Sequence, residues 1–130
     1  MIRSIFIAIS LLWCLTAQHA ANAQCPEVLS SGGEITTNPI WYNCTDGLDI
    51  LAIETASSWN DLIIDWGDGS SLQLVGALNA GDPAITHPYA AGDPSYIVTL
   101  SESDGSCEIE GHYYAGPLVS NFWSSAFVIC

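Results

Sequence analysis

Basic residues are almost missing from this 130-residue sequence, which holds one Lys or Arg, Arg3, against 14 Asp and Glu residues. Nucleic-acid-binding proteins contact phosphates through Lys and Arg, so that function class is excluded. Anionic membranes would repel such a chain, and phosphoryl transfer needs a cationic clamp from the protein or from metals. An excess of acidic residues favours the binding of divalent cations or of neutral partners such as glycans, and it suits an environment of high salt. It can also serve solubility alone.

Several patterns that carry chemistry are missing as well. There is no C-x-x-C pair, which argues against a structural zinc site, and no G-x-S-x-G elbow for a nucleophilic serine. An EF-hand loop that began at Asp65 would need oxygen ligands where Gly67 and Gly69 stand. No apolar stretch after the N-terminal one is long enough to cross a bilayer, so no membrane insertion is expected from the rest of the chain.

The N-terminal segment has the layout of a secretory signal peptide. Arg3 precedes an apolar stretch from Ile5 to Leu15, and small residues end at Ala21-Asn22-Ala23. We expect residues 1–23 to form a signal peptide helix that is cleaved after Ala23. A secreted or cell-surface location follows from this prediction.

Four cysteines remain after residue 23: Cys25, Cys44, Cys107 and Cys130. An even number of cysteines in an exported chain predicts disulfides, and four cysteines allow three connectivities.

Short β-rich runs separated by Gly, Asp, Asn and Pro turns make up the rest of the chain. In YIVTLSES, Tyr96, Val98 and Leu100 share one face, as a half-buried strand requires. Residues 56–65 could open a helix with Ser58 as the N-cap, but the isoleucines and the glycines that follow favour a strand. Strands are expected within residues 48–55, 61–66, 71–77, 95–103 and 107–116. This spacing predicts an all-β sandwich.

Three parts are expected after the signal peptide. Residues 24–45 form an N-terminal segment with the first strand, and residues 46–116 form the domain core. Residues 117–130, PLVSNFWSSAFVIC, are apolar and end on a cysteine. We interpret them as a linker or as the first strand of a following module, and the chain as a fragment.

Two stretches of the core, LIIDWGDGS (62–70) and ITHPYAAGDPSYIVTLSESDGSC (85–107), resemble the signature of the PKD (polycystic kidney disease) domain family. That signature runs from a strand into W/F-G-D-G-S, then H-x-Y, a Gly turn and Y-x-V-x-L. The residues that match it are Trp66, Gly67, Asp68, Gly69, Ser70, His87, Tyr89, Gly92, Tyr96, Val98 and Leu100. The resemblance covers roughly residues 46–116. Pro88 and the long AGDPSY turn depart from it.

The resemblance implies an Ig-like, PKD-type β-sandwich of about seven strands. Such modules are non-catalytic spacers, adhesion units or protein-contact units of secreted and surface proteins. Their partners are other domains of the same polypeptide, surface proteins or glycans. The signal peptide, the acidic balance and the cysteine positions also resemble PKD modules of Bacteroidetes-type bacteria. The rival hypothesis is a glycan- or calcium-dependent recognition module accessory to a secreted hydrolase.

In a PKD-like arrangement Cys44 would stand just before strand B and Cys107 at strand G. A bridge between them is therefore expected, and it would close a long loop. Cys25 would pair with Cys130 in a complete chain, whereas in a fragment Cys130 would pair downstream.

The carboxylates of Asp65 and Asp68 admit three interpretations. A catalytic pair must flank a cleft, which a tight turn does not provide. A calcium site suits carboxylates near a Gly-permitted turn, and some PKD-like domains bind calcium. The favoured interpretation is structural, with Asp68 and Ser70 bonding the turn's own amides. No cofactor is expected apart from a candidate calcium ion.

The other candidates are histidines and aromatic side chains. His87 or His112 could ligate a metal or act as a base, but a structural hydrogen bond from His87 to a nearby turn is favoured. Trp66 is expected to pack between the sheets. A flat platform for sugar rings could include Trp59, the best exposed candidate, with Trp41, Trp123, Tyr113 and Tyr114, although core and interface packing is favoured for this set.

Overall fold

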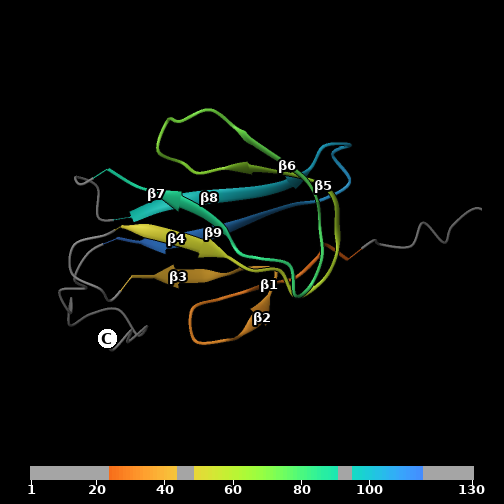
Figure 1. The fold of residues 1–130 in the computed structure, drawn as a ribbon, viewed down its shortest axis with the longest axis horizontal. Coiled ribbons are helices and arrows are strands. Elements are labelled where there is room, and N and C mark those ends of the chain that lie inside the picture. The colour runs from red at the N-terminus through yellow and green to blue at the C-terminus, as the bar shows by residue number, and fades with distance from the viewer. Residues whose placement is uncertain (1–23, 44–48, 91–94, 116–130) are drawn as a thin grey trace, which may run out of the picture.

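The computed structural model describes residues 24–43, 49–90 and 95–115 (Figure 1). These residues form strands and turns but no helix, which confirms the predicted all-β class. The strands are β1 (Val28–Leu29), β2 (Ile35–Thr36), β3 (Ile40–Tyr42), β4 (Ile50–Ile53), β5 (Trp59–Asp65), β6 (Gln73–Leu78), β7 (Ile85–Pro88), β8 (Ser95–Glu102) and β9 (Glu108–Tyr114). About seven strands were expected, and two of these nine, β1 and β2, are only two residues long.

Some expectations fall outside this part of the chain. The predicted signal peptide (1–23) and the predicted linker or strand (117–130) lie outside the described residues. Within the described residues, no helix of membrane-spanning length and apolarity occurs.

The strands form two layers. The main sheet has the order β3-β9-β8-β5-β6, with β3 parallel to β9 and all other neighbours antiparallel. In Figure 1, β4 and β7, which pair antiparallel, lie over the face of β8 and β9. Strand β1 pairs with β2 and also extends the β4 side, because Val28 bridges Thr55 and the Leu29 N–H donates to the Glu54 carbonyl at 2.9 Å. This arrangement is consistent with a β-sandwich.

Strand alternation decides which side chains form the core between the layers. In β8, Tyr96, Val98 and Leu100 are buried on one face, as their spacing predicted, while Ile97 on the other face is exposed. The largest fully buried side chains are Trp41, Trp59, Trp66, Tyr113, Ile53, Leu62, Ile64 and Leu100. Burying such aromatic side chains supplies much of the hydrophobic stabilisation of a small domain.

A bulge interrupts β5 between Trp59 and Leu62, where the register to β6 shifts. The backbone N–H groups of Asn60 and Asp61 donate to the two carboxylate oxygens of Glu102, each at 2.8 Å. Glu102 is buried, and the described residues include no Lys or Arg, so these amides stand where a cation would otherwise pair with it. The extra residue also lets Trp59 and Leu62 face the core together, although three positions separate them.

The disulfide differs from the predicted pairing. Cys25 is bonded to Cys107, with their Cα atoms 5.4 Å apart, so the expected Cys44–Cys107 and Cys25–Cys130 bridges are wrong. Cys44 and Cys130 themselves lie outside the described residues.

The parallel pairing of β3 with β9 explains the error. It places Tyr42 beside Tyr114, and the Asn43 N–H donates to the Tyr114 carbonyl at 3.2 Å. Cys107 precedes the opposite end of β9, a seven-residue strand that spans about 20 Å. Asn43, the residue that precedes Cys44 in the chain, is therefore held at the end of β9 that is remote from Cys107.

Candidate functional site

The turn after β5, residues 65–70 (DWGDGS), is closed by its own aspartates. Asp65 Oδ1 accepts the Gly67 N–H at 3.0 Å, and Asp68 Oδ1 accepts the Ser70 N–H at 3.0 Å. Both are side-chain-to-backbone bonds two residues along the chain, the usual role of Asp in turns. The prediction that the turn's own amides are bonded is confirmed for Asp68, whereas Ser70 bonds the Asp68 carboxylate through both its N–H and its side chain.

The two glycines of this turn serve different purposes. Gly67 and Gly69 have φ values of 73° and 81°, which side chains rarely adopt. A Cβ at Gly67 would overlap the backbone carbonyl of Ile97 in β8, whereas nothing lies within 4 Å of a Cβ at Gly69. Gly67 therefore holds the turn directly against β8, and Gly69 only permits the backbone to reverse.

His87 of β7 joins this turn to the second layer. Its Nε2 lies 2.7 Å from Asp68 Oδ2, and its ring stacks on Trp66 with centroids 4.5 Å apart and an interplanar angle of 8°. Both side chains of the His87–Asp68 pair are mostly shielded from solvent. The structure thus confirms a hydrogen bond from His87 to a nearby turn, and it identifies the acceptor as Asp68.

Tyr89 completes the link at the centre of an aromatic cluster. Its hydroxyl donates to the Trp66 carbonyl at 2.9 Å, and its ring stacks on Tyr96 at 4.3 Å and on Tyr113 at 4.9 Å. Burial raises the pKa of Tyr89 far above its usual range, and the carboxylate of Asp68 adds to this effect. Tyr89 is therefore a neutral, buried donor that fastens the end of β5 to β8 and β9.

Tyr113 is the member of this cluster that the motif did not include. The inward positions of β9 are Ile109, Gly111 and Tyr113. That alternation was visible in the sequence and could have placed Tyr113 in the core. Burial also raises the pKa of Tyr113.

The charge state of Asp68 follows from competing effects. Burial by itself raises the pKa of Asp68, but hydrogen bonds from Ser70 and His87 outweigh it and lower the pKa to about 2. Asp68 is therefore an anion throughout the ordinary pH range. Ser70 bonds Asp68 rather than His87, so these three residues do not have the Ser-to-His-to-Asp order of a nucleophilic triad.

The candidate calcium ligands are already engaged. Each of Asp65 and Asp68 gives one oxygen to the turn, and the second oxygen of Asp68 faces His87. Within residues 24–43, 49–90 and 95–115, no three His, Cys, Asp or Glu side chains are grouped so as to hold a metal ion. A cation at this turn would have to share Asp68 with His87.

The proposed sugar platform does not form around Trp59. Trp59 is only 1% exposed, and Trp41 and Tyr113 are buried as well, so the prediction of Trp59 as the exposed residue that a platform needs is wrong, and the favoured core packing is confirmed for these three residues. The β5 bulge turns Trp59 inward, opposite Leu78 of β6. Of its polar neighbours in the sequence, Ser57 and Ser58 precede β5, whereas Asn60 lies within β5. Trp123 lies outside the described residues.

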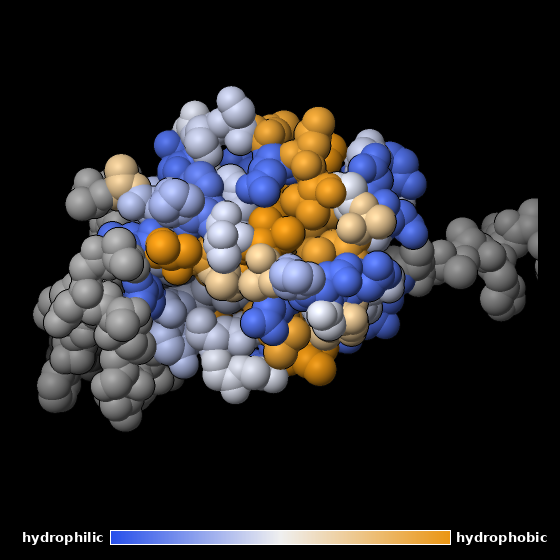
Figure 2. All heavy atoms as spheres, viewed as in Figure 1, coloured by the Kyte–Doolittle hydropathy of each residue, from blue (hydrophilic) through white to orange (hydrophobic). Residues whose placement is uncertain are grey.

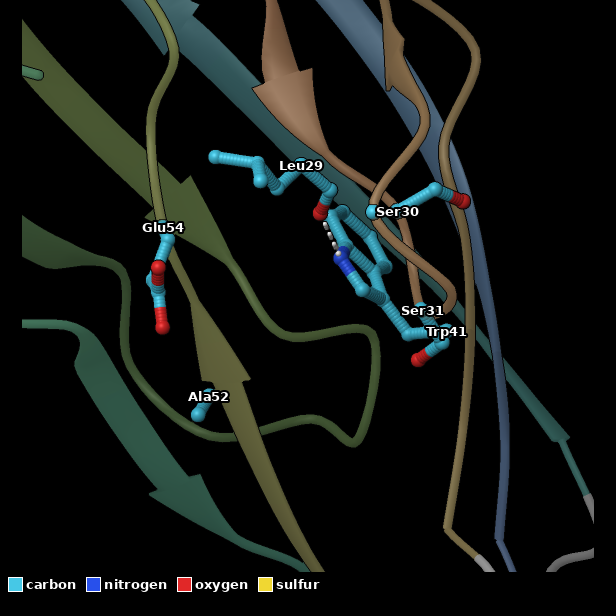
Figure 3. A pocket seen from close by; sticks show the side chains of 7 residues that line it. Leu29, Ser30, Ser31, Trp41, Ala52 and Glu54 are labelled. Carbon is cyan, nitrogen blue, oxygen red and sulfur yellow. Dashed lines mark hydrogen bonds between the residues drawn. The ribbon is translucent and has the colours of Figure 1, made fainter.

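The described surface has hollows at two places that a ligand could enter. The first, about 190 Å³, lies between the β1–β2 turn and β4, and Figure 3 shows Leu29 and Trp41 on one side of it and Ala52 and Glu54 on the other. There the Trp41 Nε1 donates to the Leu29 carbonyl at 2.9 Å. Small-molecule pockets are usually larger, from about 300 Å³.

The second hollow, about 520 Å³, lies beside the disulfide and is lined by Gln24, Cys25, Thr37, Asn38, Glu108, Ile109 and Glu110. Neither hollow includes Asp65, Asp68 or His87. The motif turn therefore does not open into either of them.

No family model, curated protein or solved structure matches this chain.

Proposed function

We propose that this chain is a non-catalytic, PKD-like contact and spacer module of a secreted or cell-surface protein. The observation that carries the proposal is the convergence of the motif side chains on one structural cluster. Trp66, Asp68, His87, Tyr89 and Tyr96 contact one another across both layers. Their polar atoms are used to hold the turn and the layers together, as a scaffold requires.

The disulfide also supports this proposal. The Cys25–Cys107 bridge closes a loop with a sequence separation of 82 residues, and bridges over long loops typically stabilise by about 2–4 kcal/mol. That stabilisation suits a small domain in an oxidising, extracellular setting.

The second candidate is a calcium- or glycan-dependent recognition module accessory to a secreted hydrolase. The observation in its favour is the presence of two carboxylates, Asp65 and Asp68, at one strand end.

Titration calorimetry and thermal melting with calcium and with a panel of polysaccharides separate the two candidates. The contact-module proposal expects no heat of binding and no shift in melting temperature. Saturable heat with a raised melting temperature, both lost in Asp68→Asn, would favour the recognition module.

An enzyme would show hydrolysis that disappears in Asp65→Asn or Asp68→Asn. The scaffold proposal expects both variants to melt at lower temperature without the loss of any activity.

A further inference from the structure

Strand β6 forms an open edge of the main sheet. It pairs with β5 on one side, and no strand of the described residues pairs with its other side. Figure 2 shows apolar side chains gathered at the surface over the β5–β6 hairpin. Leu74 in this strand is 77% exposed, and Leu72 just before it is 57% exposed.

This edge lacks the side chains that usually protect an edge strand. Residues 71–78, SLQLVGAL, contain no Pro, no Lys and no acidic residue. The pairing with β5 shifts register twice, once at the β5 bulge and once near Gly76 of β6, where φ is 81°. An unprotected apolar edge presents free backbone donors and acceptors to another extended chain.

Carboxylates flank this edge on one face of the sheet. Ile63 of β5 is directly opposite Leu74, and alternation places Asp61 and Asp65 on the same face as Ile63, one on each side of it. Both aspartates are exposed. Asp61 Oδ2 accepts from the Ser103 hydroxyl and Asp65 Oδ1 from the Gly67 N–H, so each carboxylate uses one oxygen within the domain. The outer face near Leu74 is therefore an apolar strip between two negative charges.

Charge decides what kind of chain fits there. The described residues include no Lys or Arg, so a second copy would bring the same Asp61 and Asp65 carboxylates toward this edge. An added strand lies about 5 Å from β6 and about 10 Å from β5, a gap that a long Lys or Arg side chain can bridge toward Asp61 or Asp65. The complementary occupant is an extended segment that alternates apolar and basic residues.

We infer that β6 binds a basic, extended segment of a partner protein by strand addition, with an apolar side chain of that segment beside Leu74. This inference rests on the proposed function as a contact module and names its partner class. Backbone hydrogen bonds supply the pairing, while Asp61 and Asp65 select positive charge.

The test uses the full chain and a nine-residue peptide that alternates Lys and Val. Amide chemical-shift changes locate the binding, and calorimetry measures the Kd. Two control peptides are used, one with alternate backbone amides N-methylated, which keeps the charge but cannot pair, and one with Glu in place of Lys. We expect shift changes concentrated on β6 and at least tenfold weaker binding of both controls.

Two matched variants test the position. Leu74→Lys and Ile97→Lys each replace an exposed apolar residue of the main sheet and change the net charge equally, but Ile97 lies on β8, away from the edge. We expect Leu74→Lys to weaken peptide binding at least tenfold and Ile97→Lys to leave it within threefold. Equal losses in the two variants, or undiminished binding of the N-methylated peptide, would overturn strand addition in favour of general charge attraction.

Self-association is measured by sedimentation of the unmodified chain. A dimer that Leu74→Lys dissolves would assign the edge to a second copy and overturn the basic partner. If the peptide does not bind, and the chain also binds neither calcium nor polysaccharides, the β6 inference is overturned but the contact-module proposal is not.

Discussion

The two edges of the main sheet are built in opposite ways. At the β3 edge, the Ser31 N–H donates to the Ile40 carbonyl, and Ser30 Oγ both accepts from the Ile40 N–H at 2.8 Å and donates to its carbonyl at 2.6 Å. Ser31 Oγ accepts the next outward amide, that of Tyr42, at 3.1 Å. At the β6 edge the described residues provide no such cover, and Leu74 faces solvent.

Close packing also separates the two edges. Trp41 of β3 is buried over Gly111, where a Cβ would overlap the indole ring. At Gly76 of β6, a Cβ would meet nothing within 4 Å. The comparison shows that, within the described residues, one edge is closed by the domain itself and the other is left open.

The largest expected change in stability comes from comparing one substitution at each edge. Trp41→Ala should lower the free energy of unfolding by about 3–5 kcal/mol, because it empties a fully buried site. Leu74→Ala should change it by no more than about 0.5 kcal/mol, because that side chain is exposed. Guanidinium denaturation followed by circular dichroism measures both values. A loss at Leu74 as large as that at Trp41 would mean that the β6 edge is covered in solution.

The second-largest expected loss of stability comes from the 65–70 turn that leads into β6. This turn is packed against β8, although the β6 strand that follows it forms the open edge. Gly67→Ala should cost about 3 kcal/mol, since the left-handed backbone penalty adds to an overlap with the Ile97 carbonyl. Gly69→Ala has the same backbone penalty without the overlap and should cost about 1 kcal/mol. Thermal melting of the two variants compares them, and equal losses would contradict the contact with β8.

Ser30→Ala tests how the β3 edge is closed. The variant leaves the Ile40 N–H without its side-chain acceptor and should lower stability by about 1–2 kcal/mol. Hydrogen exchange should quicken at Ile40, while exchange at Val75 in β6 stays unchanged. Unchanged exchange at Ile40 would show that Ser30 does not close this edge.

The smallest effect is a pH dependence of the β5–β6 hairpin. The folded-state pKa of Asp68 is about 2, below its ordinary value of 3.8, so its stabilising contribution is complete above about pH 4 and is lost as the pH falls toward 2. The difference in melting temperature between the natural chain and Asp68→Asn should therefore shrink from pH 5 to pH 2. A difference that stays constant over this range would rule out the ionised Asp68 as the anchor.

Much of the fold was predictable because it depends on local patterns. The alternation of Tyr96, Val98 and Leu100 identified the inner face of β8, and the Gly and Asp residues of 65–70 identified the turn after β5. The resemblance brought Trp66, His87 and Tyr89 into one set, and in the structure these residues are in contact. None of these expectations needed long-range geometry.

Two features were not predictable in this way. Core packing was favoured for Trp59, but the β5 bulge that turns it inward was not foreseen. By residue type Glu102 is expected at the surface, yet it is buried and accepts hydrogen bonds from the N–H groups of Asn60 and Asp61. A bulge has no periodic signature, because one extra residue shifts the faces without changing the composition.

The sequence by itself determined the all-β class, the positions of the main turns and the uniformly acidic character, because each depends on residue type and nearest neighbours. Only the tertiary structure decided that Cys25 bonds Cys107, that His87 reaches Asp68, and that one edge of the sheet is closed and the other open. These features depend on which distant strands become neighbours and in which direction they run. The parallel placement of β3 beside β9 is such a choice, and no local pattern in either strand encodes it.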